Sequence, residues 1–170
     1  MMTAGIRPMV EQDKSALMRI LSATPEFKPA EVGVAEEVIN SYLQQPSSYR
    51  ISVAEMAAED AGYICYGQTP MTESTWDIYW LVVAHSKRGQ GIGGALLQSA
   101  EDDIQKAGGR LIIIETSSQP GYEKTRRFYT DHGYEFICRI VDFYAPGDDK
   151  ITLQKHLSKI EPVSTIGGMV

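Results

Sequence analysis

Lys87-Arg88-Gly89-Gln90-Gly91-Ile92-Gly93-Gly94 separates the apolar segment Trp76–Val83 from a helical pattern whose apolar residues recur every four positions from Ile92 to Ile104. A glycine-rich turn that opens a helix presents several unpaired backbone N–H groups to one point, and the helix dipole adds partial positive charge there. Glycines also let a ligand approach the backbone closely. The stretch therefore predicts an anion site suited to a phosphate or pyrophosphate.

Two nucleotide-binding motifs compete for the same glycines. Gly89, Gly91 and Gly94 match G-x-G-x-x-G, and Glu115 lies at about the distance of a ribose-binding acid. However, His85-Ser86-Lys87 separates the strand from the glycines, and only one strand–helix–strand unit is visible. The preceding strand also alternates in polarity, which is uncommon in a central parallel strand. A dinucleotide site is thus the weaker alternative, and a P-loop is excluded because no Gly-Lys-Ser/Thr follows.

Hydrophobic periodicity and turn residues predict strands and helices around this loop. Strand–helix–strand in the middle of the chain, with hairpins on either side, indicates a mixed sheet in an α+β (α/β mixed) domain. We expect one domain over residues 1–157 and a poorly ordered tail over 158–170. The predicted strands are Ala4–Pro8, Ile51–Met56, Gly62–Tyr66, Trp76–Val83, Leu111–Ile114 (buried on both faces), Tyr134–Phe143 and Lys150–Lys155, with a turn at Glu59-Asp60; the predicted helices are Glu11–Ser22, Gly33–Gln44, Ile92–Lys106 and Glu123–Asp131.

Composition narrows the class of protein. The 170 residues have a net charge of -6, whereas a general nucleic-acid binder needs a basic surface. There is no signal segment and no apolar run near the ~20 residues of a membrane helix, so we expect a cytoplasmic protein without membrane or nucleic-acid partners. Cys65 and Cys138 are expected to be buried free thiols, and no metal-ligand spacing joins them to the histidines.

Two motifs together resemble a known family. Arg88-x-x-Gly91-x-Gly93 resembles the Q/R-x-x-G-x-G/A signature of the GNAT N-acetyltransferase superfamily. Downstream, Arg126-Arg127-Phe128-Tyr129-x-x-x-Gly133-Tyr134 is similar to that family's A-x-x-F/L-Y-x-x-x-G-F segment. The resemblance is strong from Trp76 to Phe136 and extends over Ile6 to Leu157.

The resemblance implies a three-layer fold, in which a twisted sheet of about seven strands splays apart between about four helices. It implies acetyl-CoA as co-substrate and no metal. The pantetheine arm would lie in the splay and the pyrophosphate on the glycine loop, where Lys87, Lys124 and Arg127 would add positive charge. The implied cofactor-binding residues are Leu81, Val82, Val83, Arg88, Gly89, Gln90, Gly91, Ile92, Gly93, Gly94, Tyr122 and Arg126.

The resemblance also implies an acid and a base. Tyr129 stands where the family has a tyrosine that protonates the leaving thiolate, and the ordinary pKa of a phenol is near that of a thiol. Asp77 is the leading candidate for the base, because its interval before Arg88 suits a catalytic carboxylate and its alternation with Leu81 and Val83 places all three on one face. Glu115, at the end of the next strand, is the rival. Tyr122 departs from the family's usual asparagine.

These features predict an N-acetyltransferase that moves the acetyl group of acetyl-CoA to a primary amine of a small molecule or peptide, by direct attack in a ternary complex. The alternatives are an inactive GNAT-like domain that senses coenzyme A and, more remotely, a nucleotide-dependent oxidoreductase. The identity of the acceptor is left open, although Asp142, Asp148 and Asp149 would attract a cation. A homodimer is compatible with these expectations.

Overall fold

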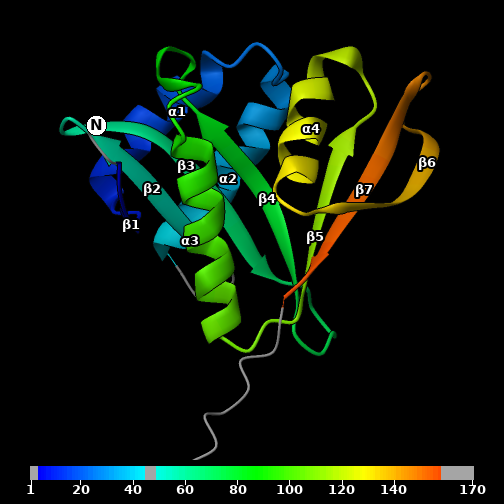
Figure 1. Ribbon diagram of the computed structural model, residues 1–170. Coiled ribbons are helices and arrows are strands. Elements are labelled where there is room, and N and C mark those ends of the chain that lie inside the picture. Colours follow the sequence, from blue (N-terminus) through cyan, green and yellow to red (C-terminus); the bar gives the residue numbers. More distant parts are fainter. Residues whose placement is uncertain (1–3, 45–48, 158–170) are drawn as a thin grey trace, which may run out of the picture.

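One mixed sheet organises the computed structural model, which describes residues 4–44 and 49–157 (Figure 1). Its strand order is β1-β2-β3-β4-β5-β7-β6, and every neighbouring pair is antiparallel except β4 and β5. The strands are β1 Gly5–Pro8, β2 Arg50–Met56, β3 Glu59–Gln68, β4 Thr75–Val83, β5 Leu111–Ser117, β6 Glu135–Ala145 and β7 Asp148–His156. The helices are α1 Lys14–Ser22, α2 Pro29–Gln44, α3 Ile92–Lys106 and α4 Glu123–Asp131, with 3-10 turns at Glu11–Asp13, His85–Lys87 and Pro120–Tyr122.

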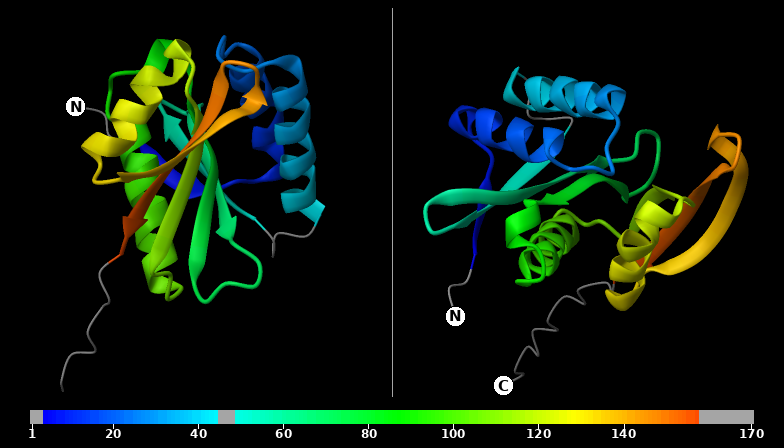
Figure 2. Two further views of the ribbon diagram at one scale, coloured as in Figure 1. Left: turned by 90° about the vertical axis from the view of Figure 1, so that its right-hand side faces the viewer. Right: turned by 90° about the horizontal axis from the view of Figure 1, so that it is seen from above.

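The helices form a layer on each face of the sheet, with α1 and α2 on one face and α3 and α4 on the other (Figure 2). Each layer buries one hydrophobic cluster, because α1, α2 and α3 carry apolar residues at helical spacing and α4 contributes the adjacent Phe128 and Tyr129. The cluster beneath α1 and α2 includes Leu17, Leu21, Ile39, Val53 and Val82. The cluster beneath α3 and α4 includes Leu96, Ile104, Ile78, Ile114 and Tyr129. The predicted three-layer fold is confirmed.

Two predicted boundaries are wrong for local reasons. Helix α2 begins at Pro29 rather than Gly33. Proline suits the first helical position, and the Glu31 carboxylate accepts a hydrogen bond from the Lys28 N–H at 2.7 Å. The turn between β2 and β3 lies at Ala57 and Ala58 instead of Glu59-Asp60, and both alanines have positive φ, 54° and 60°. Neither is a residue that signals such a turn.

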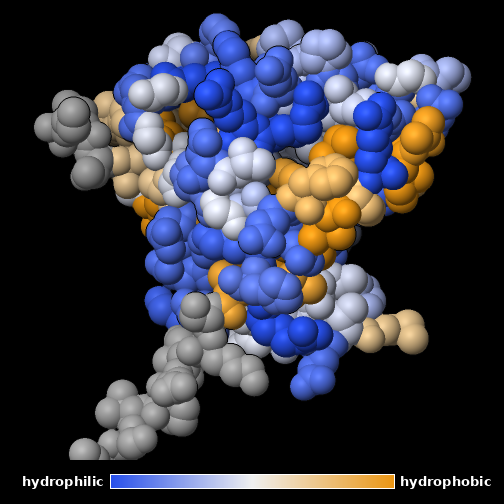
Figure 3. Space-filling view, turned by 45° about the vertical axis from the view of Figure 1, so that its right-hand side comes forward, coloured by the Kyte–Doolittle hydropathy of each residue, from blue (hydrophilic) through white to orange (hydrophobic). Residues whose placement is uncertain are grey.

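Burial also differs from expectation in the second half of the sheet. Strand β5 continues to Ser117 and is buried on one face only, since Ile112 and Ile114 are buried while Leu111 and Ile113 are half-buried. Cys138 is exposed rather than buried. It lies on β6, an edge strand whose exposed apolar residues are Phe136, Ile137, Ile140, Val141, Phe143 and Tyr144. Figure 3 shows apolar side chains on this side of the molecule.

No helix in the described ranges is long and apolar enough to cross a membrane. The tail predicted over 158–170 lies outside the described residues.

Candidate active site

Strands β4 and β5 part halfway along their length. They pair in parallel only from Thr75 to Ile78 on β4 and from Leu111 to Ile114 on β5. Beyond these residues β4 runs on to Val83 and β5 to Ser117, while each keeps its antiparallel neighbour on the other side. We call the gap between the two strand ends the splay. Along it, backbone groups of β4 have no strand partner. An extended ligand with amide groups could pair with them.

A bulge in β4 decides which side chains face which layer. Cys65 lies opposite Trp80 and Tyr66 opposite Ile78, so Tyr79 is an extra residue in the ladder with β3. Ile78 packs toward α3, and beyond the bulge Leu81 and Val83 pack on this same side. Asp77 therefore lies on the opposite face, toward α1 and α2. The prediction that Asp77 shares a face with Leu81 and Val83 is wrong, because an extra residue reverses the alternation.

The glycine loop has the geometry of an anion site. Gly89 and Gly91 have positive φ, 76° and 79°, and Gly91 is the residue from which α3 begins. In the described part of the chain, the N–H groups of Gly89, Gln90 and Gly91 have no hydrogen-bond partner. The first N–H groups of α3 add to this set because helix N-termini leave them unbonded. These donors, with the helix dipole, favour a bound phosphate.

Gly94 has a packing role in addition. A Cβ atom at this position would lie 3.2 Å from Nε2 of His132, a residue at the end of α4. The absence of a side chain thus lets α3 and α4 approach each other closely. Within this glycine-rich stretch, Gly89 and Gly91 give the loop the geometry of an anion site, and Gly94 permits the close contact between the helices.

Several predicted cofactor residues are held by neighbouring groups. Arg88 donates from Nε to the Val83 carbonyl and from Nη1 to Glu26 Oε1, both at 3.2 Å. Tyr122 donates its hydroxyl to the Glu26 carbonyl at 2.9 Å. Arg126 donates to the Ser117 carbonyl at 2.6 Å and so fixes the end of β5. Arg88 and Tyr122 both meet the α1–α2 connection, which the sequence did not associate with them.

The cations predicted near the phosphates divide into two groups. Lys87 pairs with Glu59 at 3.4 Å, and Arg88 and Arg126 make the contacts above. Lys124 and Arg127, on α4, have no ion pair among the described residues. These two side chains are the ones left to meet a negatively charged ligand.

Tyr129 is buried on the α3–α4 side of the sheet. It shares the α3–α4 cluster with Ile78 and Ile114, the last paired residues of β4 and β5. Its ring packs edge-on against Phe128 and Tyr134, with centroids 5.2 and 5.5 Å away. Burial raises the pKa of the phenol, which therefore stays protonated at neutral pH. None of the hydrogen bonds between described residues involves its hydroxyl, which is therefore available to a ligand.

The two candidate bases lie on the α1–α2 side of the sheet. Asp77 is opposite Ile113 in the parallel ladder and accepts a 2.5 Å hydrogen bond from Thr69 Oγ1. Glu115 follows the last paired residue of β5 and forms an ion pair with Lys150 at 2.8 Å. Glu115 shares this face with Ile113 because both alternate with the buried Ile114. The two carboxylates thus lie next to the point where β4 and β5 part, and Tyr129 lies on the opposite face of the sheet.

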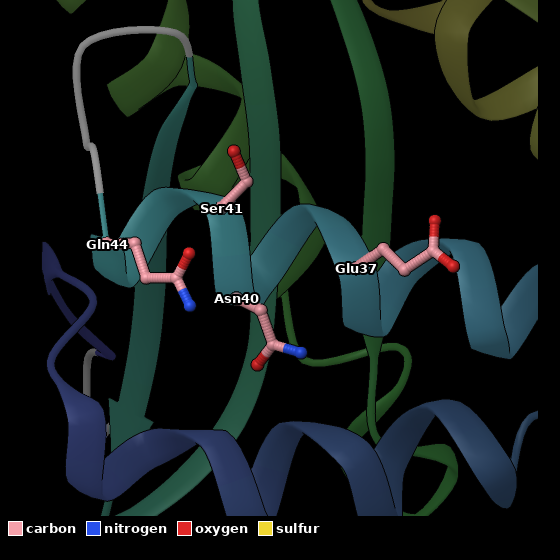
Figure 4. Close-up of a pocket in the computed structure, with 4 residues that line it drawn as sticks. All are labelled: Glu37, Asn40, Ser41 and Gln44. Atoms are coloured by element: carbon pink, nitrogen blue, oxygen red, sulfur yellow. The ribbon is translucent and has the colours of Figure 1, made fainter.

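Two surface depressions lie away from this point. One, of about 410 Å³, is lined by four residues of α2: Glu37, Asn40, Ser41 and Gln44 (Figure 4). The other, of about 760 Å³, lies between α1, the β2–β3 turn and the residues just after β4. Neither includes a residue of β5 or α4. No group of metal-ligating side chains suitable for an ion occurs in residues 4–44 and 49–157.

Comparison with known proteins identifies the family. Residues 47–136 match the acetyltransferase (GNAT) domain model. A crystal structure of a Desulfovibrio desulfuricans protein assigned to the GNAT family is 36% identical, covers 92% of this chain and 100% of its own, and superposes with a TM-score of 0.88. No curated protein sequence matches the chain. The chain belongs to the GNAT acetyltransferase family and is an acyltransferase.

More distant solved structures share the fold. The ribosomal-protein alanine N-acetyltransferase of Escherichia coli is 16% identical, with a TM-score of 0.76 over 95% of this chain and 98% of its own. An aminoglycoside 6'-N-acetyltransferase complexed with coenzyme A is 20% identical, with a TM-score of 0.72 over 92% of this chain and 99% of its own. The two proteins act on different acceptors, so the fold alone does not define the acceptor.

Proposed function

We propose that the protein transfers the acetyl group of acetyl-CoA to a primary amine by direct attack in a ternary complex. The observation that carries this proposal is the placement of a buried, protonated tyrosine on one face of the sheet and of two carboxylates on the other face, next to the splay. A carboxylate can take a proton from the ammonium group while the tyrosine, from a separate position, gives one to the leaving sulfur. The named activities of the two distant structures, on a ribosomal-protein alanine and on an aminoglycoside, agree with an amine acceptor.

The residues around the splay fit acetyl-CoA. The unbonded N–H groups of Gly89, Gln90 and Gly91 would hold the pyrophosphate. The backbone of β4 from Leu81 to Val83, beyond its pairing with β5, would hold the pantetheine amides. Lys124 and Arg127 would add positive charge on the α4 side. When bound, acetyl-CoA supplies the acetyl group as an activated thioester.

The chain's own residues then carry the proton transfers. A carboxylate, Asp77 in our assignment or Glu115 as its rival, takes the proton of the ammonium through a water. The neutral amine forms the new N–C bond as the C–S bond of the thioester breaks, and the nitrogen then loses a second proton to water to give the neutral amide. Tyr129 gives its proton to the leaving sulfur and regains one from solvent. The carboxylate returns its proton to solvent, and no atom changes its oxidation state.

A second candidate, a domain that binds coenzyme A without chemistry, makes a different prediction for Tyr129. A sensor would need no buried phenol with an unpartnered hydroxyl beside the thioester position. A turnover assay separates the two functions. Purified protein is mixed with acetyl-CoA and a panel of polyamines, amino acids, aminoglycosides and peptides with free N-termini, and free coenzyme A thiol and acetylated product are measured. If free thiol is released only when one class of amine is present, the protein is an acetyltransferase. If acetyl-CoA binds but no amine is acetylated, the protein is a coenzyme A sensor.

A further inference from the structure

The connection between α1 and α2 crosses the end of the splay and is held from both of its sides. Glu26 lies in this connection and accepts two hydrogen bonds. Its carboxylate accepts from the Arg88 guanidinium at 3.2 Å, and its backbone carbonyl accepts from the Tyr122 hydroxyl at 2.9 Å. Arg88 follows β4, and Tyr122 follows β5. Figure 1 shows this connection at the same end of the sheet as the beginnings of α3 and α4. Glu26 is therefore fixed next to the gap between the two strands.

The Glu26 carboxylate has one oxygen in use and one without a partner. Oε1 accepts from Arg88, but Oε2 is buried and has no hydrogen-bond donor among the described residues. Burial by itself raises the pKa of this carboxyl. The hydrogen bond from Arg88, the charge of Arg88 and the backbone N–H of Glu26 itself together lower the pKa below its usual value. The group is thus ionised at neutral pH. A buried anionic oxygen without a donor is costly, and the partner that suits it is a cationic N–H group.

The neighbouring acidic groups are already engaged. Glu31 accepts from the Lys28 N–H at 2.7 Å, and Glu115 is paired with Lys150. Asp148 accepts a short hydrogen bond from Ser117. Among these carboxylates, Glu26 is the one whose buried oxygen is unpartnered.

We propose that Glu26 binds the ammonium group of the acceptor and that Arg88 positions its carboxylate for this contact. The inference rests on the proposed function. Because Arg88 also touches the Val83 carbonyl, one guanidinium joins the cofactor side of the splay to the acceptor side. Glu26 is assigned to binding and not to proton removal, since a carboxylate stabilised in its ionised form is a weak base.

The test is steady-state kinetics of Glu26→Gln with an amine that the wild-type protein acetylates. Glutamine keeps the size and can still accept from Arg88, but it removes the charge. We expect KM for the amine to rise about 10-fold or more, because a charge-assisted hydrogen bond is lost, while kcat changes little. The Kd for acetyl-CoA, measured by calorimetry, should stay unchanged. Glu36→Gln is the matched control, because Glu36 lies on α2 and pairs with Lys14 at 3.2 Å away from the splay; it should alter neither constant.

A second readout separates charge recognition from a structural role. The alcohol analogue of the acceptor, in which a hydroxyl group stands in place of the amine, is tested as a competitive inhibitor. Wild type should bind the amine more tightly than the alcohol, and Glu26→Gln should lose this preference. If the glutamine variant does not fold, Glu26→Asp, which keeps the charge but shortens the reach, should keep the preference with a raised KM. An unchanged KM and preference in an active variant overturn the inference, and a fall in kcat alone does so as well. If wild type acetylates no amine, the proposed function itself has failed.

Discussion

Tyr129 is the residue on which the proposed mechanism depends most directly. Tyr129→Phe keeps the buried ring and removes only the hydroxyl. General acid catalysis contributes roughly 10²–10⁴-fold, and we expect a fall in kcat of about 10-fold or somewhat more, since a thiolate leaves fairly well without help. The Kd for acetyl-CoA should change little. Steady-state turnover and calorimetry on the same variant provide the two measurements.

The control for this change is Tyr134→Phe. The Tyr134 hydroxyl donates to Glu101 at 2.9 Å, and its ring packs against Tyr129. Its loss should lower stability but not kcat. Full activity of Tyr129→Phe would remove this phenol from the mechanism and leave water as the proton donor. Loss of binding together with turnover would make Tyr129 a residue that positions the cofactor.

Asp77→Asn tests the assignment of the base. We expect kcat/KM to fall most at low pH, because at high pH the amine already lacks its extra proton and needs no base. Asparagine can still accept from Thr69, so the local hydrogen bond should survive. Glu115→Gln should have the smaller effect. The pH–rate profiles of both variants are measured, and a large loss confined to Glu115→Gln would exchange the two assignments.

At the scale of the elements, a charged pair links β1 to α1. Arg7 donates to both carboxylate oxygens of Asp13, at 2.7 and 2.9 Å, and this hydrogen bonding lowers the pKa of the largely buried Asp13. A folded-state pKa below the unfolded one means that the stabilisation is present above about pH 4 and is lost as the pH falls through the folded pKa. Asp13→Asn should therefore lower the free energy of unfolding by about 1–3 kcal/mol at pH 7 and by less near pH 2.

Urea denaturation at the two pH values measures this difference. Glu11→Gln, an exposed change in the same 3-10 turn, should leave the free energy of unfolding within about 0.5 kcal/mol at both. An equal loss for Asp13→Asn at both pH values would contradict the electrostatic origin of the effect.

The elements also show what the sequence could and could not predict. Helix α3 was predictable because its apolar residues follow a helical period, and β5 because it contains an unbroken apolar run. The bulge at Tyr79 was not, since neither glycine nor proline accompanies it, and one extra residue moved Asp77 to the other face. Glu26 was missed because its contact with Arg88 joins positions 62 residues apart. The proposed cofactor loop is a local motif, whereas the proposed acceptor side is assembled from distant segments.

At the scale of the whole molecule, binding at the glycine loop should appear as thermal stability, because a ligand that binds only the folded state raises the melting temperature. Acetyl-CoA at about 100 times its Kd should contribute about 2.7 kcal/mol, or roughly 5–10 °C for a chain of this size. Gly91→Asp should abolish the shift. Its carboxylate would lie beside the unbonded N–H groups where the phosphates are expected, and like charges repel there.

Gly91→Asn separates charge from conformation. Gly91 has a φ of 79°, a strain that asparagine and aspartate tolerate about equally, and a Cβ atom there meets nothing within 4 Å. Both variants should therefore lose similar stability without ligand, while Gly91→Asn should keep most of the shift that acetyl-CoA produces. Differential scanning fluorimetry across a series of acetyl-CoA concentrations measures both quantities. An aspartate variant that is stabilised as much as wild type would show that the phosphates bind elsewhere, and equal loss in both variants would show that backbone freedom at Gly91, not charge, governs the site.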